Sequence, residues 1–189
     1  MKDKIKEIFE ESIKTKEKTL EYTDEIEKAA IIMIDSLKNN NKILICGNGG
    51  SAADAQHMAG ELVGRFEKER KGLPCIALTT DTSILTAWIN DYNYDSVFSR
   101  QIEALGNEGD ILIGITTSGN SKNVIEAVEK AKQKNMKTII LSGKDGGKIR
   151  EIDTDVNIVI PSNNTARIQE SHITIIHMWC KIIEDEIFK

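Results

Sequence analysis

His57 and Glu61 are the first residues of this chain whose types and spacing suggest chemistry. They are four positions apart, so on a helix they would lie about 40° apart around the axis, on one face. His177 lies on a mostly apolar helical segment, where a single histidine is usually a core residue. Together with His57 and Glu61 it would complete a zinc set of two histidines and one carboxylate, to which the oxygen of Gln169 could be added. Gln169 and His177 are eight positions apart, about 80° around a helix. The sequence alone does not show whether the two segments meet.

A glycine-rich loop, Gly47–Ser51, directly precedes the segment that carries His57. Glycines let a backbone turn sharply and approach a ligand closely. Ser51 is predicted to cap the following helix, whose free N–H groups and dipole favour an anion. The loop does not end in the Gly-Lys-Ser/Thr of a Walker loop, and Ala52 replaces the third glycine of the dinucleotide pattern. A phosphate-sized cradle is therefore predicted rather than a nucleotide site.

A second polar cluster follows the apolar run at 110–115. Four hydroxyls stand within six residues, directly before a predicted helix: Thr116, Thr117, Ser118 and Ser121. Hydroxyls and free helix N–H groups together suit a phosphate without any lysine. The alternative is a helix cap with no ligand, but a cap needs only one hydroxyl. The cluster favours a bound phosphate.

Short apolar runs alternate with helical segments from residue 42 onward. Strands are predicted at 42–45, 75–78, 110–115, 138–141 and 156–160, and helices at 83–89, 97–105, 121–134 and 165–188. This rhythm predicts a five-stranded parallel sheet covered by helices on both faces, a three-layer α/β/α sandwich in flavodoxin-like order. Ligands of such sheets bind beyond the carboxyl ends of the strands, so both polar loops should border one crevice.

The chain is predicted to be one domain, 1–189, with N-terminal helices in 1–40 and the βα core in 41–189. Ile5, Ile8, Phe9 and Ile13 form a narrow apolar stripe on the first helix, and Thr23–Asp24 is predicted to cap the second. A stripe outside the βα units favours an oligomer contact. The alternative is a helix that lies on its own domain.

Composition excludes several classes of protein. A net charge of −5 argues against a nucleic-acid backbone as the main partner. No apolar run has the length of a membrane span, and the first residues lack a signal-peptide core. Cys46, Cys75 and Cys180 are odd in number and sit in apolar surroundings, which is typical of reduced thiols in a cytoplasmic protein.

Almost the whole chain resembles the phosphoheptose isomerase (sedoheptulose 7-phosphate isomerase) family of single sugar-isomerase (SIS) domains. The matching motifs are CGNGGSAADAQH with the following Glu61, INDY, FSRQIEALG, TTSGNS, LSGKDGG, and ARIQE with the downstream His177. The resemblance implies a five-stranded α/β/α sandwich, assembled as a homotetramer with active sites at subunit interfaces. It implies conversion of sedoheptulose 7-phosphate to D-glycero-D-manno-heptose 7-phosphate through an enediolate, in nucleotide-activated heptose biosynthesis.

The resemblance also assigns roles to residues of this chain. It implies that Glu61 and His177 are the acid/base pair, and that one zinc ion per subunit is held by His57, Glu61, Gln169 and His177. The phosphate would be bound by Thr116, Thr117, Ser118 and Ser121. The remaining substrate contacts would come from Asn48, Gly49, Gly50, Ser51, Asn90 and Asp91, with Glu61 and Gln169.

A related group suggests a second hypothesis. The replication-initiator-associating (DiaA-like) proteins share the fold, the glycine loop, the ARIQE stretch and a similar N-terminal helix, and they act by binding an initiator protein without catalysis. Glu61 and His177 are not expected together in that group. Because both are present here, the sequence favours the isomerase.

Overall fold

The structure, a computed structural model, describes all residues 1–189 and contains one parallel sheet of five strands. The strands are β1 (Ile43–Gly47), β2 (Cys75–Ala77), β3 (Ile111–Thr116), β4 (Lys137–Gly143) and β5 (Val156–Ile160). Their spatial order is β2-β1-β3-β4-β5, and every neighbouring pair is parallel. The flavodoxin-like order predicted from the sequence is confirmed.

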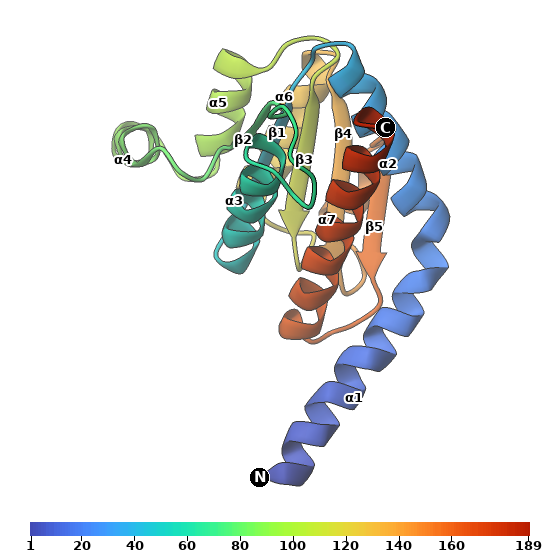
Figure 1. Ribbon diagram of the computed structural model, residues 1–189. Helices are drawn as coiled ribbons and strands as arrows, with labels where there is room; N and C mark the ends of the chain where they lie inside the picture. The colour runs from blue at the N-terminus through green and yellow to red at the C-terminus, as the bar shows by residue number, and fades with distance from the viewer.

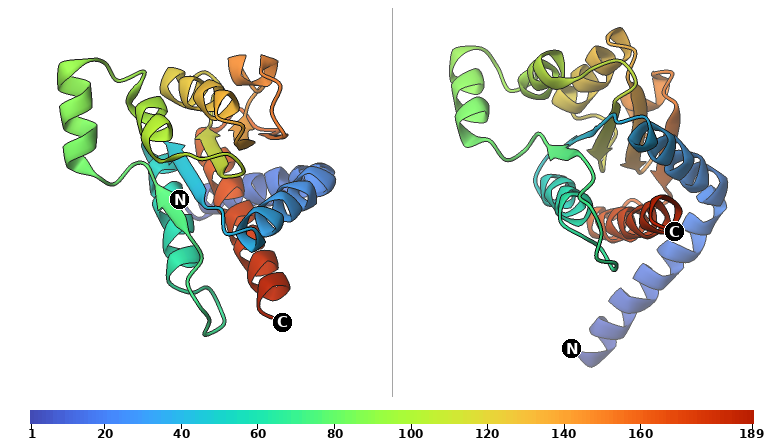
Figure 2. Two further views of the ribbon diagram at one scale, coloured as in Figure 1. Left: turned by 90° about the horizontal axis from the view of Figure 1, so that it is seen from above. Right: turned by 45° about the horizontal axis from the view of Figure 1, so that its top comes forward.

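Helices cover both faces of the sheet (Figures 1 and 2). They are α1 (Lys2–Thr19), α2 (Thr23–Lys38), α3 (Gly50–Val63), α4 (Thr82–Asp91), α5 (Val97–Leu105), α6 (Lys122–Gln133) and α7 (Thr165–Ile187), with short 3-10 turns at Leu20–Tyr22 and Lys148–Glu151. Residues alternate between the faces of a strand, so Ile43 and Ile45 pack toward α2, α3 and α7, whereas Leu44 and Cys46 pack toward α5 and α6. The three predicted layers are present.

Two predicted helix caps are wrong. The residue before α2 is Tyr22, and Thr23 lies inside the helix with its hydroxyl on the Leu20 carbonyl. The residue before α3 is Gly49, with φ of 57°, and Ser51 lies inside the first turn, buried. Glycine replaces the expected capping side chain because the loop turns through a positive φ, which a side chain disfavours.

Two helices extend from the body of the molecule. The N-terminal part of α1 runs beyond the sheet layers, and α4 stands apart from the sheet beside α5 (Figure 1). The apolar stripe on α1 is exposed along this extension, at Ile5, Ile8, Phe9 and Ile13. None of the helices combines the length and the apolar composition that crossing a bilayer requires.

His172 ties α7 to the sheet from a fully buried position. Its Nε2 lies 2.9 Å from the Ser142 carbonyl oxygen of β4, whereas its Nδ1 has no hydrogen-bond partner. Burial, only partly offset by the bond to Ser142, lowers the pKa of His172 from 6.5 to about 4. The imidazole is therefore neutral in the folded protein near pH 7.

We predict that His172 makes the fold less stable in mild acid. As the pH falls from 6.5 toward 4, the unfolded chain binds a proton on His172 that the folded chain does not. The free energy of unfolding should therefore fall, by about 3 kcal/mol in total from this residue. Urea unfolding between pH 7 and pH 4.5 measures this loss, and His172→Gln should reduce it. The same pH dependence in wild type and variant would contradict the prediction.

Candidate active site

The glycine loop brings β1 and α3 close to the start of α7. A Cβ at Gly50 would collide with the Gln169 side-chain amide, so a larger residue there would require Gln169 to move. No side chain caps α3. The glycine loop lies at the carboxyl end of β1, and the Gln169 side chain lies against it.

The hydroxyl loop ends β3 beside it. The hydroxyls of Thr116 and Ser121 are 3.0 Å apart, and Ser121 precedes α6 without making a side-chain cap. The alternative of a simple cap is therefore not supported for Ser121. Gly119 turns the loop with φ of 68°. A Cβ there would collide with the carbonyl oxygen of Gly146, so the loop after β4 packs directly against the hydroxyl loop.

The two loops are joined by Asn48, a predicted substrate contact, and by two side chains that the sequence analysis did not select, Asn123 and Tyr94. The amides of Asn48 and Asn123 exchange two hydrogen bonds of 2.9 Å, and the Tyr94 hydroxyl donates to the Asn48 oxygen at 2.6 Å. Asn123 is nearly fully buried. Its position two residues after the hydroxyl cluster was the available signal, because side chains in the first turn of a helix face the loop that precedes it.

His57, Glu61 and His177 converge, although 116 positions separate the last two. The His57 Nε2 lies 3.1 Å from Glu61 Oε1 and 3.2 Å from His177 Nε2, and one ligand atom from each residue lies within 4.8 Å of the others. These three residues are called the triad below. The helices α3 and α7 run side by side in the same direction, with Gly50 near Gln169 at one level and the two histidines in contact further along.

The triad fits a divalent metal ion. Ligands at about 2.0–2.1 Å from a tetrahedral zinc lie about 3.3 Å apart, close to the two separations found here. Two imidazole nitrogens and a carboxylate oxygen are also a usual donor set for zinc. The side chains are accessible, with exposed fractions of 46% for His57 and 24% for Glu61.

Asp54 lies on the same helix, one turn before His57. One of its carboxylate oxygens is buried without a hydrogen-bond partner. Burial raises its pKa to about 6, although the nearby His57 acts in the opposite direction. Sequence analysis missed Asp54, although the three-residue spacing from His57 placed it near the same face of the helix.

Other predicted residues do not join the triad. Gln169 is two turns before His177 on α7, an axial offset of about 12 Å, and its amide lies against Gly50 instead. Asn90 and Asp91 are in the last turn of α4, exposed, with a hydrogen bond of 2.8 Å between their side chains. Their proposed contacts with a ligand stay predictions.

Comparison with known proteins agrees with this geometry. The SIS domain family matches residues 3–143. The phosphoheptose isomerase of Aliarcobacter butzleri is 57% identical over 188 residues, covering 99% of each chain, and that of Campylobacter jejuni is 61% identical over 161 residues, 85% of this chain and 86% of the other.

Solved structures give the same result. Phosphoheptose isomerase GmhA from Neisseria gonorrhoeae superimposes with a TM-score of 0.92 at 50% identity, covering 97% of this chain and 98% of that one. A phosphoheptose isomerase from Francisella tularensis gives 0.93 at 45% identity, covering 97% of both. The chain therefore belongs to the SIS domain family and, within it, to the phosphoheptose isomerases.

Proposed function

We propose that this protein converts sedoheptulose 7-phosphate to D-glycero-D-manno-heptose 7-phosphate, an aldose–ketose isomerisation in nucleotide-activated heptose biosynthesis. The observation that carries the proposal is the meeting of Glu61 and His177 in the triad, on a helix that begins at one of two loops suited to a phosphosugar. The relatives that bear the name phosphoheptose isomerase support the same substrate. A DiaA-like role has no need of this convergence, so the geometry favours the enzyme.

The reaction moves a proton between C1 and C2 of the sugar and another between the two oxygens. We assign the carbon-bound proton to the Glu61 carboxylate, which accepts it from one carbon and returns it to the other. His177 moves the proton between the oxygens, because a neutral imidazole both donates and accepts. The half-buried position of Glu61 keeps the carboxylate accessible to the sugar while limiting water around it.

We propose that the triad holds one zinc ion per subunit. Zinc bound there would supply a positive charge that stabilises the enediolate oxygens. A carboxylate bound to a metal ion is a weaker base, so Glu61 would need to leave the ion during part of the cycle. Gln169 lies closer to the glycine loop than to the triad, and this position favours a contact with the substrate. Its side chain would have to turn toward the triad to become a fourth ligand.

The remaining substrate contacts follow from the position of the two loops. The phosphate would bind the hydroxyls of Thr116, Thr117, Ser118 and Ser121 at the start of α6. Asn48, Gly49, Gly50, Ser51, Asn90 and Asp91 would contact the sugar. The distance along α3 from the loop to the triad suits an extended seven-carbon chain, with the phosphate at one end and the reacting carbons at the other.

We propose that the subunits form a homotetramer with active sites at their interfaces. A cavity of about 1100 Å³ lies between α1, α2 and α7, away from the triad. Its walls include the apolar side chains of Ile31, Ile34 and Met178. A second copy of this chain is the occupant we assign, because α1 presents an exposed stripe that is also apolar.

The three buried, unpaired cysteines support the reducing cytoplasm as the location.

We predict that removing either member of the acid/base pair abolishes turnover. Glu61→Gln and His177→Gln should each lower kcat for sedoheptulose 7-phosphate at least 100-fold, because each removes a proton-transfer group. NMR measures production of the aldose by each protein, first after bound metal has been removed by a chelator and again after zinc has been added. The control is Glu69→Gln, which alters an exposed carboxylate paired with Arg65. Turnover by Glu61→Gln at the wild-type rate would contradict the assignment.

We predict that the hydroxyl loop binds the phosphate. Ser121→Ala and Thr117→Val should raise KM about tenfold with a smaller effect on kcat, because each removes a hydrogen bond to a charged group far from the reacting carbons. Ser36→Ala is the control, since its hydroxyl bonds Gly109 at the opposite end of the sheet. An unchanged KM in both loop variants would contradict the prediction.

We predict that the α1 stripe holds subunits together. Ile8→Asp combined with Phe9→Asp should convert the tetramer to a smaller species in sedimentation analysis, because each change places a charge in an apolar contact. Glu10→Gln, on the same helix but outside the stripe, should leave the mass unchanged. A wild-type chain that sediments as a monomer would refute the tetramer itself.

A further inference from the structure

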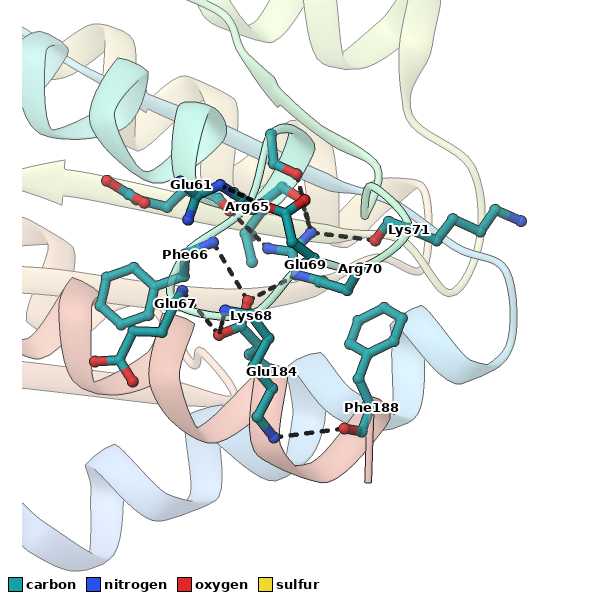
Figure 3. Close-up of polar contacts among 12 residues, drawn as sticks. Glu61, Arg65, Phe66, Glu67, Lys68, Glu69, Arg70, Lys71, Glu184 and Phe188 are labelled. Carbon is teal, nitrogen blue, oxygen red and sulfur yellow. Dashed lines mark hydrogen bonds and ion pairs between the residues drawn. The ribbon is translucent and has the colours of Figure 1, made fainter.

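Arg70 and Glu184 form an ion pair in the interior, close to Glu61 at the end of α3 (Figure 3). Arg70 lies in the loop between α3 and β2, and Glu184 lies near the end of α7. Arg70 Nε donates to Glu184 Oε1 at 3.0 Å, and the exposed fractions of the two side chains are 2% and 0%. A pair this deeply buried is retained only where further hydrogen bonds satisfy both groups. The partners of those bonds connect the pair to the triad.

The guanidinium holds the end of α3. Arg70 Nη2 donates to the Glu61 carbonyl at 2.7 Å, and Nη1 donates to the Leu62 carbonyl at 2.8 Å. The last carbonyls of a helix have no partner within the helix, so Arg70 supplies it. Glu61 contributes its carboxylate to the triad. Its backbone is thus fixed by the same side chain that bonds to α7.

The carboxylate of Glu184 accepts hydrogen bonds from the loop that follows α3. It accepts from the backbone N–H of Glu67 and Lys68 at 2.9 Å and from that of Phe66 at 3.3 Å. Burial by itself would raise the pKa of Glu184, but these backbone bonds and the bond from Arg70 outweigh it and lower the pKa. The group is therefore an anion that pulls three amides toward α7, as the converging dashed lines in Figure 3 show.

Phe66, in the loop that bonds to Glu184, contacts the triad on α7. The Phe66 ring lies 5.8 Å from the His177 ring, measured between centroids, with 37° between their planes. Glu184 itself is seven residues after His177, so both lie on one face of α7, about 20° apart. One pair of charges therefore touches the backbone of Glu61 and, through Phe66, the ring of His177.

We propose that Arg70 and Glu184 are positioning residues for the triad. They fix the level of α3 against α7, so that Glu61 and the two histidines meet at the separations that a metal ion requires. The apolar contacts between the helices have no directional preference, whereas the Arg70–Glu184 bonds do. The inference rests on the proposed metal site, and it concerns metal binding rather than turnover.

The chain offers a matched control. Lys181 and Glu67 form a second ion pair of 2.7 Å between α7 and the same loop, but their side chains are 42% and 57% exposed, unlike the buried pair. This pair links the same two segments without touching the backbone of Glu61. A general weakening of the contact between loop and helix should therefore appear in Lys181→Met as well as in the variants of the buried pair.

The experiment is a titration of metal-free protein with Co²⁺, which has visible absorption bands that zinc lacks. Arg70→Lys keeps the charge beside Glu184 but removes the planar set of donors, and Glu184→Gln keeps the shape but removes the anion. Both should bind Co²⁺ about tenfold or more weakly than wild type, with altered bands, because the ligands are no longer held in place. Lys181→Met should bind within about twofold of wild type.

Circular dichroism of the metal-free proteins, at the temperature of the titration, shows whether each variant is folded. Weaker binding by folded variants supports the proposal. Unchanged affinity and spectrum in both variants overturn it, even when their melting temperatures fall. Variants that are unfolded at every temperature also overturn it, because the pair would then hold the whole fold rather than the triad. Absence of Co²⁺ binding by wild type would instead refute the metal site on which the inference rests, whatever the isomerase activity.

Discussion

The packing of α3 against α7 is the contact on which the site depends. Each helix carries part of the triad, so the proposed metal ion and the proposed acid/base pair both depend on this contact. The parallel sheet beneath sets this packing, because α3 follows β1, α7 follows β5, and both helices pack on the same face. Gly50 allows α7 to approach closely at one level, and the two histidines meet at the next.

The two loops proposed to bind the phosphosugar and the triad proposed to transfer protons lie at different places. The hydroxyl loop and the glycine loop lie at the carboxyl ends of neighbouring strands, joined by Asn48 and Asn123. The triad lies further along α3, away from those loops. In the proposed mechanism, the hydroxyl loop binds the phosphate and thereby holds the sugar near Glu61, while the acid/base residues make no contact with the phosphate. Holding the substrate at one end in this way would position the reacting carbons at the other.

Sequence reasoning predicted the fold well because its signals are local. Apolar runs such as 156–160 and helices such as 97–105 agree with the observed bounds, and right-handed crossovers leave few strand orders. Spacing placed His57 and Glu61 on one face of a helix, but their convergence with His177 depended on tertiary packing. Tyr94, Arg70 and Glu184 were missed for the same reason, because nothing local distinguishes a buried network from a solvated charge, whereas Asn123 had a local signal in its position after the hydroxyl cluster. The Ser51 cap was wrong because Gly49 takes a positive φ that residue propensities alone do not indicate.

The most direct test of the isomerase is to follow sedoheptulose 7-phosphate with the wild-type protein in D₂O by ¹H NMR. Proton transfer by the accessible Glu61 carboxylate predicts that aldoheptose 7-phosphate accumulates and carries deuterium at C2, because the carboxylate exchanges its proton with solvent. Product that retains only protium at C2 would contradict transfer through an exchangeable carboxylate. No product and no exchange into the substrate, with or without added zinc, would contradict the isomerase itself.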